Sequence, residues 1–164
     1  MDDRTVLRIL EEQERVFHFD KFDGDDAWKL GCCLIEEAKE RGFQPAFSIR
    51  MNNGYTVFQY GFTGTGLDHS NWMTRKENLV KVKQMSSLRC HYLLKEIGEN
   101  MKDVWFLDPM DNSDCGGAFP ILLNGFGMVG CILASGISAL NDHDVIIGGL
   151  CRFFGKNNIE RICD

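Results

Sequence analysis

The stretch AFPILLNGFGMVGCILASG, residues 118–136, decides the fold, because two apolar β-forming runs surround an Asn124-Gly125 pair. An Asn-Gly pair favours the tight turn of a β-hairpin, since both residue types tolerate a positive φ. Gly125, Gly127 and Gly130 also carry the spacing G-x-G-x-x-G of a dinucleotide-binding loop. Such a loop needs a helix directly after its glycines, whereas here the apolar run CILASG follows. The stretch therefore predicts a hairpin, with Gly125 in the turn and with Gly127 and Gly130 packed closely against neighbouring backbone.

A second hairpin is expected within PAFSIRMNNGYTVFQYGF, residues 45–62, where apolar and polar residues alternate before an Asn53-Gly54 pair. Residues 62–70 are expected to form a loop, and residues 102–118 an irregular segment. The spacing of apolar residues predicts helices over residues 3–15, 21–42, 71–98 with a break near Ser86-Ser87, and 141–155 with Asn141 or Asp142 as the N-cap. The order α-α-β-β-α-β-β-α indicates an α+β fold, an antiparallel β-sheet flanked by helices, in a single domain over residues 1–164.

Composition limits the classes of function. A net charge of -6 in 164 residues argues against non-specific nucleic-acid binding, which needs a basic surface. The N-terminus lacks the pattern of a signal peptide, and no apolar run is long enough to cross a membrane. Seven cysteines, an odd number, indicate reduced thiols and a cytoplasmic location. The cysteines and the four histidines show no metal-ligand spacing, so no metal site is expected.

One expected helix face combines an aromatic ring with two cations, because Trp72, Arg75 and Lys76 stand at i, i+3 and i+4. This face is suited to a small anionic ligand. Alternatively, Trp72 packs in the core and the two cations pair with nearby acids. The sequence leaves both interpretations open.

The ends of the 118–136 hairpin are the other candidate site. Cys115 lies just before Gly116-Gly117, and its thiol is either a reactive group or a small buried filler. His143, in the first turn of the last expected helix, is either a ligand or base, or a hydrogen-bond partner of a loop carbonyl. A pairing of Cys115 with His143 would make the chain a thiol-based enzyme.

Several short motifs occur in an order that resembles the haem-degrading-domain superfamily, and most closely its uncharacterised cytosolic branch related to the GlcG and HbpS proteins. The motifs are D-A-W-K-L-G at 26–31, W-M-T-R-K at 72–76, S-S at 86–87, G-G-A-F-P-I at 116–121, S-G at 135–136 and D-H at 142–143. The resemblance spans nearly the whole chain.

The resemblance implies a profilin-like fold, homo-oligomers and haem as a ligand. It also implies that the family's pattern positions are those of Arg75, Lys76, Gly116, Gly117, Ser135, Gly136 and His143. The chain departs from the pattern at Cys115, where the branch usually carries a histidine, and the segment LDPMDNSD, residues 107–114, is shorter than usual.

Three hypotheses follow from the sequence. The first is a cytoplasmic oligomeric binding protein for haem or another small anionic ligand, rather than an enzyme. The second is an enzyme that uses Cys115 and His143. The third is a scaffold whose apolar strand edge, such as Phe58–Phe62, assembles subunits.

Overall fold

The computed structural model describes all residues from Met1 to Asp164. In chain order the elements are α1 (Asp3–Val16), β1 (His18–Phe19), α2 (Gly24–Glu40), β2 (Ala46–Met51), β3 (Thr56–Gly61), α3 (Leu67–Lys83), α4 (Ser87–Ile97), α5 (Met101–Trp105), β4 (Ala118–Leu123), β5 (Gly127–Ser135) and α6 (Ala139–Phe154). The α+β class with helices around one sheet is confirmed.

One five-stranded sheet has the order β1-β4-β5-β2-β3. Both predicted hairpins are present, β2 with β3 and β4 with β5, and β2 also pairs with β5 in an antiparallel direction. The expectation of a purely antiparallel sheet was wrong at one edge, because the two-residue strand β1 runs parallel to β4. Such a short strand carries no sequence alternation that could reveal it.

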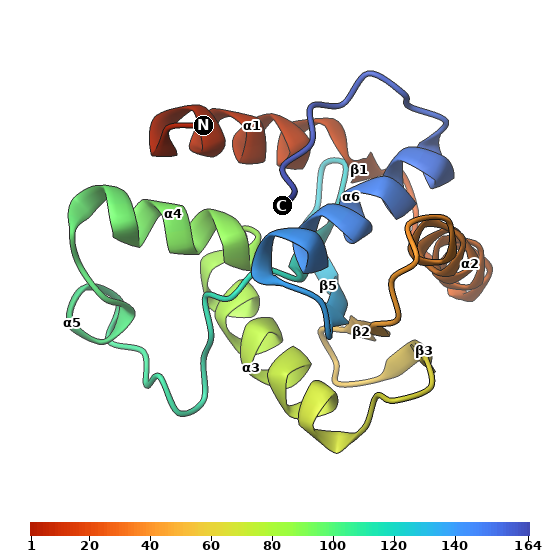
Figure 1. Ribbon diagram of the computed structural model, residues 1–164, viewed down its shortest axis with the longest axis horizontal. Helices are drawn as coiled ribbons and strands as arrows, with labels where there is room; N and C mark the ends of the chain where they lie inside the picture. Colours follow the sequence, from red (N-terminus) through yellow and green to blue (C-terminus); the bar gives the residue numbers. More distant parts are fainter.

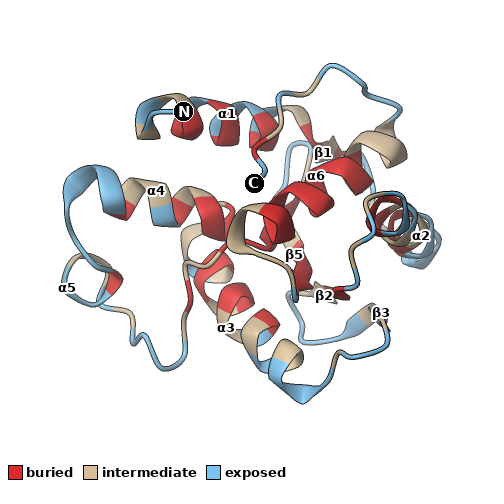
Figure 2. Cartoon of the chain, viewed as in Figure 1, coloured by how far each residue is buried: buried red, intermediate tan, exposed pale blue.

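Helices cover both faces of this sheet (Figure 1). Side chains alternate along each strand, so one set of strand residues packs against α2 and α6 and the other against α3. The first face contains Phe47, Phe119 and Ile132 together with the buried stripes of α2 and α6. The second contains Cys131 and Leu133 against Met73 of α3. Figure 2 shows the resulting concentration of buried residues along α6 and the inner sides of α2 and α3.

A third apolar cluster joins α1 to α4, away from the sheet. It contains Val6, Ile9 and Leu10 of α1, Leu88 of α4, and Ile162 from the segment that follows α6. Figure 1 shows this terminal segment running back from the end of α6 toward α1. The start of α4 therefore packs against both α1 and the terminal segment. This part of α4 forms one wall of the cavity described below.

The predicted break in the long helical region is confirmed. The helix α3 ends at Lys83, followed by Gln84 with φ 54°, and α4 begins after Ser86, whose side chain accepts a hydrogen bond from Arg89 N. Two boundaries were wrong: α3 begins at Leu67, inside the expected loop, and the irregular region contains the short helix α5.

The cap of the last helix was also assigned wrongly. Ser138 is the N-cap of α6, and its hydroxyl accepts a hydrogen bond from Asn141 N. Asp142 is instead turned inward, as described below.

In the hairpin turn, Gly125 has the expected positive φ of 73°. Gly130 is packed closely as expected, because a Cβ there would lie 2.7 Å from Arg50 O, whereas Gly127 has no such neighbour. No helix combines the length and the apolar character needed to cross a bilayer.

Candidate functional site

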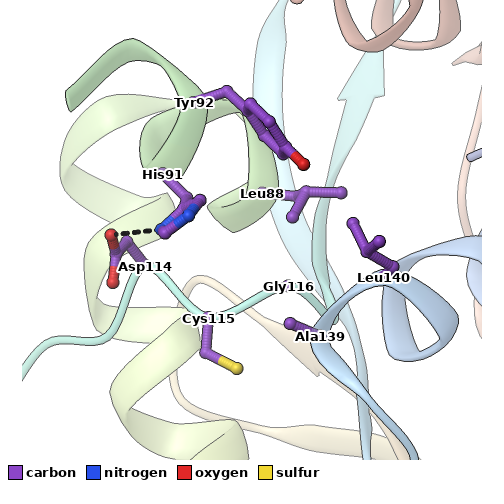
Figure 3. A pocket seen from close by; sticks show the side chains of 8 residues that line it. All are labelled: Leu88, His91, Tyr92, Asp114, Cys115, Gly116, Ala139 and Leu140. Carbon is purple, nitrogen blue, oxygen red and sulfur yellow. Dashed lines mark hydrogen bonds and ion pairs between the residues drawn. The ribbon is translucent and has the colours of Figure 1, made fainter. Parts of the chain in front are cut away.

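A cavity of about 300 Å³ lies where α4, the segment before β4 and the first turn of α6 meet. Figure 3 shows its lining, which is mainly apolar: Leu88, His91, Tyr92, Asp114, Cys115, Gly116, Ala139 and Leu140. Leu88 also belongs to the apolar cluster of α1 and α4, and Tyr92 and Leu140 pack against that cluster. The cavity therefore has a wall fixed by core packing and a rim that carries a few polar groups.

The principal polar feature of the cavity is an ion pair between His91 and Asp114. His91 Nδ1 lies 2.9 Å from an Asp114 carboxylate oxygen. This hydrogen bond raises the pKa of His91 above its ordinary value of 6.5. The other ring nitrogen, Nε2, forms no hydrogen bond within the protein. A histidine held by a carboxylate through one nitrogen presents the other to a ligand or metal in a fixed orientation.

A second cavity, of about 330 Å³, shares His91 and Asp114 with the first. Lys95 lines this second cavity, and its ammonium lies 2.8 Å from Asp3. The His91–Asp114 pair thus stands at the boundary of the first cavity and of a second one whose lining includes Lys95, Glu99 and Asn100.

Lys76 is 1% exposed, so its ammonium acts within the protein. It donates to Ala134 O at 2.9 Å and to the Asp142 carboxylate at 3.1 Å. The other Asp142 oxygen accepts a hydrogen bond from Ile137 N at 3.0 Å. This buried ion pair joins α3 to the end of β5 and the start of α6, and it occupies the ammonium that the sequence suggested for a ligand.

Gly117 stands directly beside this pair. Its φ is 114°, and a Cβ there would lie 2.7 Å from Lys76 Nζ and 2.9 Å from Asp142 Cβ. Gly116 lines the cavity, and a Cβ there would meet the carbonyl group of Ala139. The two glycines let the backbone pass between α3 and α6, which brings Cys115 to the rim of the cavity.

Cys115 lines the cavity as a half-buried free thiol. Burial raises its pKa above the ordinary value, although the nearby Lys76 charge opposes this shift. Its Sγ forms no hydrogen bond, and Figure 3 shows the thiol turned away from the His91 ring. Nothing in this arrangement activates the thiol as a nucleophile.

His143 does not lie with Cys115. It is fully buried, and its Nε2 lies 2.8 Å from Gln13 Oε1 of α1. Its Nδ1 has no hydrogen-bond partner. Burial lowers the pKa of His143 to about 3, so the ring is neutral. The Cys115–His143 pair that the sequence suggested is therefore not formed, because the side chain of His143 faces α1 rather than the cavity.

The remaining sequence candidates lie apart from the cavity. The Arg75 guanidinium stacks on the Trp72 ring, with 4.0 Å to its centroid, at the outer side of α3. Ser135 is buried at the end of β5, where it pairs with Ala46 of β2. Gly136 has a φ of 128°, and a Cβ there would lie 3.1 Å from the His69 ring. Of the predicted residues, only Cys115 and Gly116 line the cavity, with Gly117 and Lys76 behind them.

Sequence reasoning missed His91 and Tyr92 of α4 and Asp114 as members of one site. Asp114 directly precedes Cys115, but His91 stands 23 residues before Asp114, with no motif that links them. Only the path of the loop between α5 and β4 brings them together. No group of three or more His, Cys, Asp or Glu side chains is arranged to hold a metal ion.

The sequence of this chain matches a family model and several known proteins. A model described as "Haem degrading protein HbpS-like" matches residues 22–151. A UPF0303 protein of Edwardsiella ictaluri is 34% identical over 157 residues, which cover 96% of this chain and 99% of that protein. A UPF0303 protein of Streptomyces coelicolor is 34% identical over 147 residues, covering 90% of this chain and 92% of that one.

Solved structures agree with the fold. The crystal structure of Ybr137w protein has a TM-score of 0.82 at 23% identity and covers 93% of this chain and 95% of its own. The crystal structure of a PduOC:heme complex has a TM-score of 0.67 at 15% identity, with 87% of this chain and 99% of that one covered. These similarities establish the fold alone.

Proposed function

The chain belongs to the family of HbpS-like haem-degrading proteins, and from this premise we propose that it binds haem, or a flat amphipathic ligand of similar chemistry, beside His91. The observation that carries the proposal is the His91–Asp114 pair, which leaves Nε2 without a partner at the boundary of two cavities. A heme complex of a protein with the same fold, PduOC, supports the choice of ligand.

The residues present fit a haem. Ligand pockets of roughly 300–1,000 Å³ suit small organic molecules, and the two cavities of about 300 and 330 Å³ meet at His91. The apolar side chains Leu88, Tyr92 and Leu140 offer contacts to the faces or edges of a macrocycle. His91 would hold the iron through Nε2, with Asp114 fixing the orientation of the ring. A bound haem would supply redox chemistry or binding of small molecules at its iron.

An anionic group of the ligand has a partner in the second cavity. Lys95 lines that cavity, and its ammonium forms an ion pair with the partly exposed Asp3 at the start of α1. Exchanging this surface ion pair for a ligand carboxylate costs little, because exposed pairs contribute about 0–1 kcal/mol or less. We therefore propose that an anionic group of the ligand lies near α4, and not on the Trp72, Arg75 and Lys76 face that the sequence suggested.

The experiment is a titration of the purified protein with haem, followed by absorbance and by thermal unfolding. We expect a saturable shift of the haem absorbance, and stabilisation of about 2.7 kcal/mol at a hundredfold excess over Kd. The variant His91→Gln is expected to lose at least about tenfold in affinity. The matched control is His18→Gln, because the side chain of His18 makes no hydrogen bond and lies outside both cavities. Equal haem affinity of His91→Gln and the native protein would reject the proposal.

A second candidate function is self-assembly, which one specific feature favours. The strand β3 is an edge of the sheet, and Tyr55, Tyr60 and Trp28 are exposed on or near it. We propose that this edge joins subunits into a homo-oligomer. Phe58 packs inward, since a Cβ on Gly31 would overlap its ring, so Tyr60→Asp tests the edge better than Phe58→Asp. Light scattering should show an oligomer that Tyr60→Asp dissociates, and a monomeric native protein would contradict the idea.

Two further proposals concern the domain organisation and the location of the protein. We propose that residues 1–164 form one domain, supported by the contact of α1 and the terminal segment with α4 in one apolar cluster. We also propose a cytoplasmic location, supported by the odd number of cysteines, all of them free. Limited proteolysis and localisation of a tagged chain test these two points.

A further inference from the structure

Arg75 differs from every other arginine of the chain in having no ion pair. The others, Arg4, Arg8, Arg15, Arg41, Arg50, Arg89, Arg152 and Arg161, each lie within 4.0 Å of a carboxylate. The side chain of Arg75 makes neither an ion pair nor a hydrogen bond. Its guanidinium stacks on the Trp72 ring at 4.0 Å, and this contact restricts its orientation while leaving its N–H groups available.

Arg75 lines a groove of about 430 Å³ between α3 and the loop before β4. The groove is polar and contains Asp68, Asn71, Thr74, Arg75, Asn78, Pro109, Met110 and Asp111. The carboxylates of Asp68 and Asp111 also form no ion pair and no hydrogen bond. Charges of both signs therefore face one groove without neutralising each other.

The walls of this groove are fixed to each other. Asn78 Nδ2 donates to Asp111 O at 2.8 Å, and Ser113 N donates to Arg75 O at 3.0 Å. Within the loop, Met110 N donates to the Asp108 carboxylate at 2.9 Å. Because the loop is bound to α3 at two points, a ligand that enters the groove immobilises few protein groups. Binding therefore costs little conformational entropy of the protein.

We propose that this groove binds a small zwitterion, a free amino acid or a short peptide with free termini. The guanidinium of Arg75 receives the ligand carboxylate through paired N–H donors, the geometry that arginine favours. Asp68 and Asp111 receive the ammonium. Two carboxylates in the groove repel a phosphate or a dicarboxylate, and this selects a ligand that carries both signs of charge.

The groove is separate from the proposed haem site. It shares neither His91 nor Asp114 with the cavities there, and Pro109 is the one residue common to the groove and the second cavity. Loss of zwitterion binding and loss of haem binding are therefore distinguishable. The variant Arg75→Gln should leave the haem titration unchanged.

The test is isothermal titration calorimetry of the full chain with L-glutamine and with the dipeptide alanyl-glutamine. Two control compounds are N-acetyl-L-glutamine, which lacks the ammonium, and L-glutaminamide, which lacks the carboxylate. We expect saturable binding in the micromolar to millimolar range by at least one of the first two, and the tighter of them identifies the source of the zwitterion. Each control compound should bind at least about tenfold more weakly, because it loses one charge-assisted contact.

Variants of the charged groove residues test which side chains contact the zwitterion. Arg75→Gln should weaken binding at least about tenfold, and Asp68→Asn with Asp111→Asn should do the same. Arg4→Gln is the matched control, since it removes a cation that is 91% exposed and does not line the groove. The proposal is overturned if neither zwitterion binds, if the control compounds bind equally well, or if Arg75→Gln binds as the native chain does.

Discussion

Replacing Asp142 by asparagine is expected to destabilise the fold by about 3–5 kcal/mol, because the change leaves the Lys76 ammonium buried without a counter-charge. Lys76 is 1% exposed and Asp142 4% exposed, so water cannot compensate for the lost partner. Asparagine keeps an oxygen for Ile137 N, so that hydrogen bond is retained while both the charge and the acceptor that face Lys76 are removed. The pair also fixes the start of α6 beside Gly116 and Gly117, so its loss should loosen one wall of the cavity.

The assay is urea unfolding followed by tryptophan fluorescence. With a slope of about 1–3 kcal/mol per molar urea, the midpoint of Asp142→Asn should fall by more than about 1 M. Lys76→Met should be destabilising for the same reason, since it leaves Asp142 charged and buried. In the double variant the two losses should not add, with an interaction energy of about 0.5–3 kcal/mol.

The matched control is Lys21→Met. Lys21 also pairs with aspartates, Asp23 and Asp26, but its side chain is 71% exposed. Its replacement should leave the urea midpoint unchanged, because exposed ion pairs add little. Strict additivity of the Lys76 and Asp142 variants, or a midpoint shift no larger than in the Lys21 control, would refute the reasoning.

Three other predictions concern titratable groups. Because the pKa of His143 is lowered to about 3, the unfolded chain binds a proton that the native state does not, and stability should fall below pH 6.5 by about 1.4 kcal/mol per pH unit. Urea unfolding between pH 6.5 and 5 should show this slope, and His143→Gln should lose it. The raised pKa of His91 means that its pair with Asp114 stabilises the fold at low pH and is lost as pH rises through that pKa. NMR titration should find the His91 pKa lower in Asp114→Asn, and no difference would contradict the pairing. Alkylation of Cys115 should have a pH midpoint above that of a free thiol, about 8.5; a midpoint below it would restore the hypothesis of a thiol-based enzyme.

The sheet was predictable because its signals are local. Asn53-Gly54 and Asn124-Gly125 mark both hairpins. The first pair follows a run of alternating apolar and polar residues, and the second lies between two apolar β-forming runs. The break at Ser86 was also readable, since a serine that precedes a helix accepts a hydrogen bond from its first turn. The strand β1 could not be predicted from the sequence, because its two residues are too few to show a periodic pattern.

The candidate site was less predictable because it depends on contacts between distant segments. The cation spacing of Arg75 and Lys76 suggested one shared face, yet adjacent helical residues point in directions about 100° apart. Lys76 consequently lies inside against Asp142, and Arg75 lies outside on Trp72. His143 and Cys115 flank the same hairpin but face different neighbours. Only the path of the loop brings Asp114 to His91.

The identity of the iron ligand in the haem complex provides the most direct test of the proposed function. Resonance Raman spectra of the ferrous complex should show an iron–histidine stretching band in the native protein and in His18→Gln. The band should be absent in His91→Gln, because His91 Nε2 is the nitrogen that the two cavities leave without a partner. Persistence of the same band in His91→Gln would contradict the assignment of the haem site to His91.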